Sequence, residues 1–293
     1  MIQSEIRIKK LASTKKLDSP NKFLSAFTYI AAVIFISPFF LLIVTTFKDE
    51  GHIFDPFFIP NFTNFANYAM VFNTSKFISG LLNTIIITTS TLALEILIAS
   101  MAGYIISRSK ERIFKITYLI IVFGLIIPLQ SNLVVIYKIG NALHMINTMP
   151  FLILIYVAGG ATFASLIYVA FTKNIPREIE ESAKIDGCGM YATFFRVVFP
   201  LLMPATRTVI ALTIFFSWND FQGPLIYLND GKTPTLMLEI YTFKTNIGST
   251  AFYSTQWAPI FALCFLATLP MLLFFLLTQK YLNLGALDGA VKG

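Results

Sequence analysis

Few side chains in this sequence could carry out bond chemistry. The 293 residues include only two histidines and two cysteines, so a Cys/His metal site has no candidates. Gly231-Lys232-Thr233 has the form of the end of a phosphate-binding loop, but Ile226 stands where the upstream glycine of that motif would be. We therefore expect no catalytic residue, no metal and no cofactor on this chain.

The most informative polar segment is residues 174–187, where short-range signals predict a capped helix. Asn174 is a suitable N-cap, and Pro176 is tolerated in a first helical turn. Gly187 can adopt the left-handed conformation that ends many helices. A helix of about three turns is marginal in water by itself, so we expect it to dock on a partner surface. Its acidic side chains are Glu178, Glu180, Glu181 and Asp186.

Long apolar runs must position this segment. Hydrophobic residues make up 56% of the chain and charged residues 13%, about half the share of charge in a soluble domain. A membrane-spanning helix needs about 20 mostly apolar residues. The sequence therefore predicts an all-α integral membrane protein with six spans. These are residues 23–47, 80–106, 113–136, 150–172, 201–218 and 257–279.

The distribution of basic residues predicts the orientation of these spans. With the N-terminus inside, 17 of the 22 Lys and Arg residues fall in inner segments. The positive-inside rule therefore predicts a multi-pass protein with both termini in the cytoplasm. It also explains the net charge of +7 without a nucleic-acid partner. Residues 1–22 are expected to form a basic arm near anionic lipid.

The segment between spans four and five resembles the "EAA" signature of ABC importer permeases. That pattern is E-A-A, three residues, Gly, nine residues, then I-x-L-P. Here it reads Glu181-Ser182-Ala183, Gly187 and Val197-Val198-Phe199-Pro200, with the same spacing and three mild replacements. The resemblance implies that residues 173–200 contain a coupling helix that fits a cleft on an ATPase subunit. The residues it implies for this contact are Glu178, Ile179, Glu181, Ser182, Ala183, Asp186 and Gly187.

Two further motifs narrow the resemblance to carbohydrate uptake. Trp218-Asn219-Asp220-Phe221 resembles the W-N-[DE]-F segment of sugar-importer permeases related to the maltose system. The ending Gly285 to Gly293 resembles the G-x-x-x-G-[AG]-[VI]-K-G tail of the shorter, MalG-type permeases. The chain is thus similar to the MalG/MetI-like permease family over nearly its whole length. In that family the tail reaches between the ATPase subunits, here through Gly289, Lys292 and Gly293.

The resemblance also implies partners and a division of the chain. The partners are a second homologous permease, two ATPase subunits that bind ATP and Mg, an extracytoplasmic sugar-binding protein and the lipid of a bacterial plasma or inner membrane. The expected division is a cytoplasmic arm at 1–22, a permease domain at 23–280 and a cytoplasmic tail at 281–293. The implied cargo is a sugar, by family habit an oligosaccharide.

Polar residues inside or near spans are candidates for the substrate path, because such residues are costly in a membrane. The candidates are Gln130, Asn132, Trp218, Asn219, Asp220 and Gln222. These residues could have structural roles instead of binding a substrate. Threonines in a span often form hydrogen bonds with the backbone or with a neighbouring helix, and Asp220 could hold the bend after span five. Glu95 could pair with a partner permease or lie near the membrane edge.

Rival functions are an ion-coupled secondary transporter, an integral membrane enzyme and an ABC importer for a non-sugar solute. A secondary transporter would need buried ionisable residues and usually a repeated half. The sequence offers Glu95 and no visible repeat. An enzyme would need clustered His, Asp or Cys near a membrane face, which is absent.

Overall fold

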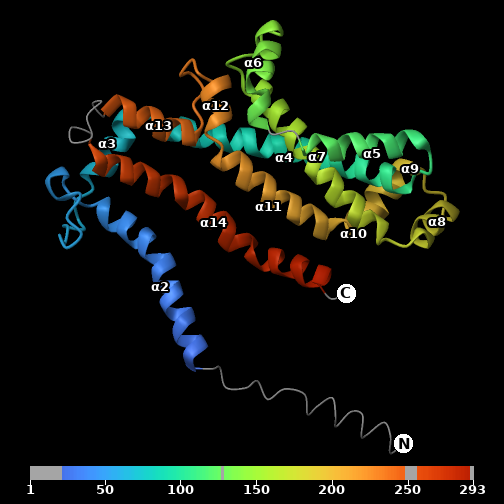
Figure 1. Ribbon diagram of the computed structural model, residues 1–293, viewed down its shortest axis with the longest axis horizontal. Coiled ribbons are helices and arrows are strands. Elements are labelled where there is room, and N and C mark those ends of the chain that lie inside the picture. Colours follow the sequence, from blue (N-terminus) through green and yellow to red (C-terminus); the bar gives the residue numbers. More distant parts are fainter. Residues whose placement is uncertain (1–21, 127–128, 248–255, 291–293) are drawn as a thin grey trace, which may run out of the picture.

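The computed structural model describes residues 22–126, 129–247 and 256–290, and within these ranges every regular element is helical. Figure 1 shows an elongated bundle of long helices, from which the first described helix projects away. The predicted all-α architecture is confirmed. The long apolar helices are α2 (Lys22–Thr45), α4 (Phe77–Arg108), α7 (Met149–Lys173), α11 (Met203–Asn219) and α14 (Trp257–Ala290).

The centre of the bundle is the pair α4 and α7, which pack along each other. A Cβ atom on Gly103 of α4 would lie 2.5 Å from Cβ of Tyr168 on α7, so the glycine permits the close approach of the two backbones. Helix α11 packs beside this pair, and Tyr168 donates a hydrogen bond to Thr206 of α11 at 3.0 Å. The core around them contains Ala99, Tyr104, Ala164, Phe194, Val198, Leu202, Ala205 and Val209.

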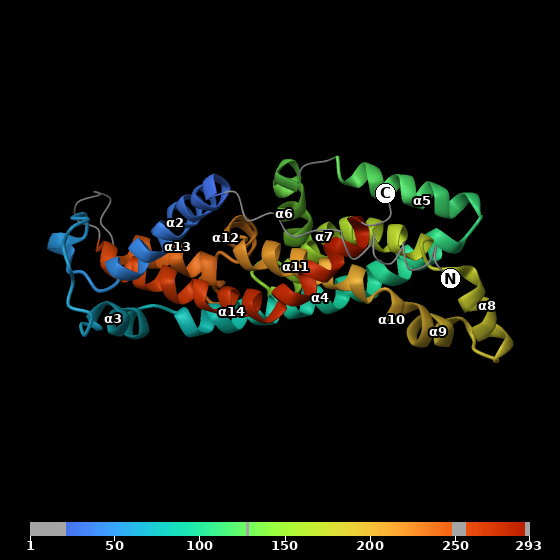
Figure 2. The same ribbon diagram turned by 90° about the horizontal axis from the view of Figure 1, so that it is seen from below.

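Shorter elements lie at the two ends of the bundle. One end holds α3 (Ala66–Thr74) and α13 (Leu236–Ile247), and the opposite end holds α8 (Arg177–Ile185) and α9 (Met190–Thr193), as Figure 2 shows. Helix α4 reaches from one end to the other. The loop before α3 includes the short η1 (Glu50–His52), and α12 (Gln222–Tyr227) follows α11.

The predicted spans one, two, four and six correspond to single apolar helices long enough to cross a membrane: α2, α4, α7 and α14. The fifth is one arm of a bent pair, because residues 190–201 and α11 meet at 74°. The first arm consists of α9, the π-helical η3 (Phe194–Val198) and α10 (Phe199–Leu201). At the bend Leu202 has φ −82° and ψ 3°, which interrupts the helix, so α11 begins at Met203 rather than at residue 201.

The predicted third span, residues 113–136, is not one helix. It is divided among α5 (Arg112–Gly124), η2 (Leu129–Asn132) and α6 (Leu133–Ala142), which points away from the bundle in Figure 1. The sequence gives a reason for a break in this region, because the proline at position 128 has no amide hydrogen with which to continue a helix. The count of six spans is therefore not confirmed by the described residues.

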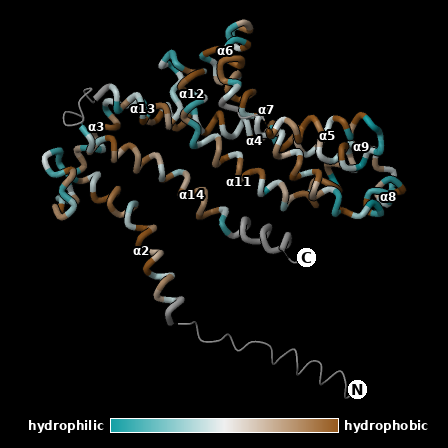
Figure 3. The backbone as a smooth tube through the Cα atoms, in the orientation of Figure 1, coloured by the Kyte–Doolittle hydropathy of each residue, from teal (hydrophilic) through white to brown (hydrophobic). Residues whose placement is uncertain are grey.

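Much of the apolar surface of these helices faces outward. In α2 no residue of the apolar window is buried, and Figure 3 shows hydrophobic residues along α2 and α14, with hydrophilic residues gathered at α8. Such surfaces suit contact with lipid or with other apolar helices. Helix α14 continues past residue 281 to Ala290, and the cytoplasmic tail from residue 281 stays a prediction. Of the expected arm at residues 1–22, all but Lys22, the first residue of α2, lies outside the described ranges, as do the last three residues.

Candidate functional site

Helix α8 ends in a rigid turn built on Gly187. The amide of Gly187 donates to the carbonyl of Lys184 at 3.0 Å, and the amide of Cys188 donates to that of Ala183 at 2.9 Å. This pair of bonds is the Schellman motif, which needs a left-handed residue after the helix. Gly187 has φ +82°, so the prediction that it ends the helix in this conformation is confirmed.

The start of α8 differs from the sequence prediction. Asn174 is not its N-cap; it is the C-cap residue of α7, and its amide bonds back to the carbonyl of Phe171. Pro176 stands at the N-cap position of α8, without a side-chain cap, and has an extended ψ of 138°. Residues 174–176 therefore connect α7 to α8, and the N-cap prediction is wrong because α7 extends further than expected.

The residues expected to meet an ATPase divide between two faces of α8. Glu178, Ile179, Glu181, Ser182, Asp186 and Gly187 are exposed. Ala183 is buried at 7% exposure, so its small side chain serves packing within this chain. Ile185, which sequence reasoning did not select, is 86% exposed at the C-terminal end of the helix. Its side chain adds an apolar group to the exposed, charged surface of α8.

Sequence reasoning also missed the anchor of this helix. Glu180 is 5% exposed and accepts two side-chain hydrogen bonds, from the Tyr104 hydroxyl at 2.9 Å and from Arg108 Nε at 2.6 Å. Arg108 in turn donates through Nη2 to the carbonyl of Ile175 at 2.8 Å. Arg177 Nη2 returns a bond to the carbonyl of Arg108 at 3.4 Å. The last turn of α4 is thereby joined to the start of α8.

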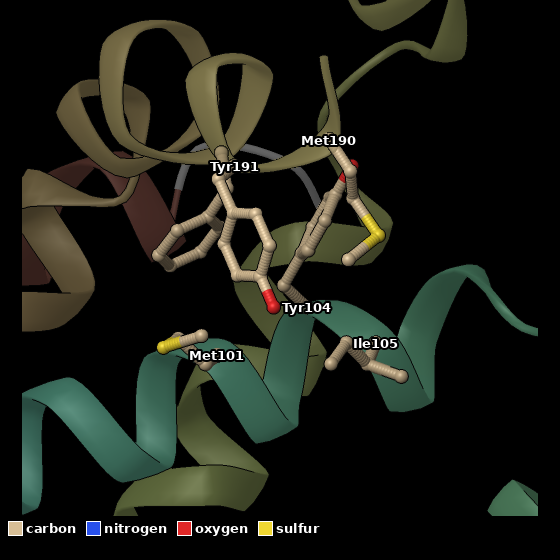
Figure 4. A pocket seen from close by; sticks show the side chains of 6 residues that line it. Met101, Tyr104, Ile105, Met190 and Tyr191 are labelled. Carbon is tan, nitrogen blue, oxygen red and sulfur yellow. The ribbon is translucent and has the colours of Figure 1, made fainter.

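A small apolar pocket lies beside this anchor, between α4 and α9. Figure 4 shows the side chains that line it, which are Met101, Tyr104, Ile105, Met190, Tyr191 and Phe194. The Tyr104 and Phe194 rings are 5.3 Å apart between centroids. Met190 and Tyr191 are 60% and 64% exposed, so apolar surface continues from the pocket onto the outside of α9. The exposed region next to α8 is thus apolar as well as acidic.

Among the residues predicted for the substrate path, Asp220 accepts several hydrogen bonds within the chain. Its carboxylate accepts hydrogen bonds from the amide of Gln222 at 3.0 Å, from the amide of Gly223 at 3.1 Å and from the Tyr156 hydroxyl at 2.7 Å. These bonds cap α12 and join it to α7. The structure therefore supports the alternative that Asp220 holds the bend after α11.

Helix α12 contacts the start of α6, the helix that follows Asn132. Tyr227, the last residue of α12, donates to the carbonyl of Leu133 at 3.2 Å, next to Asn132. Burial, followed by the nearby Asp220 carboxylate, raises the pKa of the Tyr227 hydroxyl, which keeps it a donor. Asn132 is half-buried as the residue before α6. Gln130 lies in η2 two residues earlier.

The remaining candidates differ in exposure. Trp218 is 8% exposed within an apolar cluster, and its indole N–H has no hydrogen-bond partner among the residues that the structure describes. Asn219 and Gln222 are exposed, although Asn219 Nδ2 donates to the carbonyl of Phe215 at 2.8 Å. Asn219 and Gln222 are therefore the members of this motif whose side chains remain accessible to a ligand.

Several polar residues of α4 are buried against other helices of this chain. Thr84 accepts from the amide of Leu236, and Thr88 receives a bond from Ser217 of α11. Glu95 is 3% exposed and accepts from Thr213 of α11 at 2.9 Å. Glu95 thus pairs within the chain rather than with a partner permease, and it lies near the middle of α4. Thr84 and Thr88 likewise form hydrogen bonds with neighbouring helices, which is the alternative that does not involve a ligand.

Comparison with known proteins identifies the family. The family model described as "Binding-protein-dependent transport system inner membrane component" matches residues 95–285. The melibiose/raffinose/stachyose import permease protein MelC of Bacillus subtilis is 32% identical over 93% of this chain and 98% of the relative. The probable starch degradation products transport system permease protein AmyC of Thermoanaerobacterium thermosulfurigenes is 29% identical over 93% and 97%.

A solved structure agrees in fold. A chain from a bacterial ABC transporter involved in the import of the acidic polysaccharide alginate superposes with a TM-score of 0.77 at 16% identity, covering 88% of this chain and 95% of that chain. Together with the match over most of the sequence and the apolar helices described above, this places the protein. The chain belongs to the family of binding-protein-dependent transport system inner membrane components.

Proposed function

We propose that this chain is a permease subunit of an ATP-driven importer for a sugar, with an oligosaccharide as the cargo, and that it forms half of the translocation pathway. The observation that carries the importer role is the exposed, rigidly ended α8 at one end of a membrane-helix bundle. A short helix with a fixed C-terminal turn can transmit a displacement without unwinding. The chain itself performs no bond chemistry in this role.

The α8 end of the bundle is the proposed docking site for an ATPase subunit, which places that end in the cytoplasm. Its exposed surface combines the carboxylates of Glu178, Glu181 and Asp186 with the apolar Ile185. Basic groups on a partner can pair with the carboxylates, while an apolar recess can receive Ile185. ATP and Mg are bound by the ATPase. Closure of two such subunits would move the permease pair as rigid bodies.

The sugar follows from the relatives, whose names specify melibiose and raffinose, starch degradation products and, in another Bacillus subtilis relative, arabinooligosaccharides. The exposed amides of Asn219 and Gln222 suit sugar hydroxyls, since a planar amide offers both donors and an acceptor. A second solved alginate transporter is in complex with a periplasmic protein bound to alginate pentasaccharide. We assign this chain an analogous binding-protein partner and a second permease.

Co-purification and uptake test the proposal. The tagged chain, expressed with its neighbouring transport genes and solubilised in mild detergent, should retain an ATPase subunit. Vesicles that contain the complex and its binding protein should accumulate raffinose or a maltodextrin only with internal ATP. An importer that retains the ATPase yet accumulates a non-sugar solute would overturn the cargo assignment alone. Absence of the ATPase would overturn the coupling role.

The family match favours this function over an ion-coupled secondary transporter. The buried position of Glu95 points the same way. Its carboxylate accepts a hydrogen bond from Thr213 and packs directly against Gly160. An ion-coupling carboxylate needs access to a water-filled path instead.

A further inference from the structure

We propose that Glu180 is a positioning residue for coupling. Through Arg108 and Tyr104 it fastens α8 to the adjacent end of α4, so that a displacement of α8 is passed along α4 to the opposite end of the bundle. This inference rests on the proposed function, because it assumes that α8 is moved by a partner ATPase.

The geometry singles out Glu180 among the carboxylates of the segment. Glu180 and Glu181 are adjacent and chemically the same, but Glu181 is exposed and Glu180 points into the chain. The Arg108–Glu180 ion pair has an N–O distance of 2.6 Å, with side-chain exposures of 14% and 7%. An ion pair so far removed from water is not screened as a surface pair is, so it can hold two elements in register.

Other connections between α8 and α4 are weak. Within the described part of the chain, the hydrogen bonds from α8 to α4 involve Glu180 and, at a longer 3.4 Å, exposed Arg177. Arg108 also holds the carbonyl of Ile175, the residue that leads into α8. Removing the Glu180 carboxylate therefore leaves α8 connected to α4 only by the long Arg177 bond and, just before the helix, by the bond from Arg108 to the Ile175 carbonyl.

Helix α4 has the properties needed to carry a displacement. Its 32 residues contain no proline and span about 48 Å at ~1.5 Å per residue. Near its far end, Asn83 Nδ2 donates to the carbonyl of Pro234 at 2.8 Å, and Thr84 accepts from the amide of Leu236 at 2.8 Å. Movement of α4 along its axis would therefore shift the segment that begins α13.

The test follows the far end of α4 in the complete complex with its ATPase subunits, partner permease and binding protein. Ser79 is exposed in the first turn of α4 and is replaced by cysteine in a chain whose Cys188 and Cys264 are serine. The rate of labelling by a maleimide is measured with and without ATP plus vanadate. We expect trapping to change the rate in the parent chain. In Glu180→Gln the two rates become equal, while ATPase retention and basal ATP hydrolysis persist.

Matched variants separate positioning from loss of charge and from loss of docking. Glu111→Gln removes one exposed carboxylate from the same end of the bundle and should keep the parent response. Glu181→Gln should instead reduce ATPase retention. Arg108→Lys keeps the charge but loses the bond to Ile175, and it should give a reduced response. The double variant Glu180→Gln/Arg108→Met, which also loses the bond to Ile175, should likewise show equal labelling rates with and without trapping.

Each outcome decides between the two proposals. Glu180→Gln with the parent response overturns the positioning role, and so does a parent chain that retains its ATPase but shows no change at Ser79→Cys. Absence of the ATPase from the parent complex overturns the proposed function instead. If Glu180→Gln does not assemble, Arg108→Lys carries the test, and an unaltered response there overturns the inference.

Discussion

Gly160 of α7 leaves the space that the carboxylate of Glu95 on α4 occupies. A Cβ atom on Gly160 would lie 2.6 Å from Oε2 of Glu95, and Thr213 of α11 donates to the same oxygen at 2.9 Å from another side. The carboxylate is thus enclosed by three helices of one chain. Glu95 therefore connects α4 with α7 and α11 inside the bundle.

Gly160→Val should destabilise the bundle, because the added side chain must displace the Glu95 carboxylate or part α4 from α7. Overpacking of this kind costs about 1–3 kcal/mol in the free energy of unfolding. Thermal unfolding of the detergent-solubilised chain measures it. Gly124→Ala is the matched control: its Cβ would lie 3.6 Å from the Thr162 methyl carbon, an ordinary contact. Equal stability of the two variants would contradict the enclosed position of Glu95.

Glu95→Gln should keep ATP-driven uptake, because the amide oxygen of glutamine can still accept the Thr213 hydrogen bond. Glu95→Leu should lose stability, by about 1–3 kcal/mol for a buried polar group left without its partner. Uptake in vesicles and thermal unfolding are measured for both variants. Loss of uptake in Glu95→Gln, with normal folding and ATPase retention, would indicate that the charge itself serves transport, as in an ion-coupled carrier.

Gly187→Asp should abolish transport while leaving membrane insertion intact. A non-glycine residue at φ +82° costs about 1–2 kcal/mol, and the strain falls on the turn that ends α8. Gly187→Asn should be milder, because asparagine tolerates this conformation. Gly189→Ala is the control, since Gly189 has φ −70° and open space around it. Uptake and membrane content are measured. Parent-level uptake in Gly187→Asp would contradict the docking role of this turn.

Asp220→Ala should destabilise the junction of α11 and α12, because the amides of Gln222 and Gly223 and the Tyr156 hydroxyl lose their acceptor. We expect a loss of about 1–3 kcal/mol, and Asp220→Asn should recover most of it. Gln222→Ala should leave thermal unfolding unchanged and raise the KM for sugar uptake. A raised KM in Asp220→Asn at normal stability would show that Asp220 contacts the sugar instead.

The apolar runs and the end of α8 were predictable from the sequence. Long apolar stretches exclude a soluble fold, because their backbone can be satisfied in lipid only within helices or barrels. Gly187 was predictable because glycine is the residue that enters the left-handed region without steric cost. Both are local properties, in which neighbouring residues decide the outcome without any distant partner.

Tertiary structure alone decided which carboxylate serves which purpose. Glu180 differs from Glu181 only in facing Arg108, which lies 72 residues earlier in the chain. The same holds for Glu95, whose surroundings come from Gly160 and Thr213 on two other helices. Helical periodicity tells which residues share a face, but not which distant helix covers that face. That choice depends on the packing of the whole bundle, where close approach of backbones and satisfaction of buried polar groups must be met together.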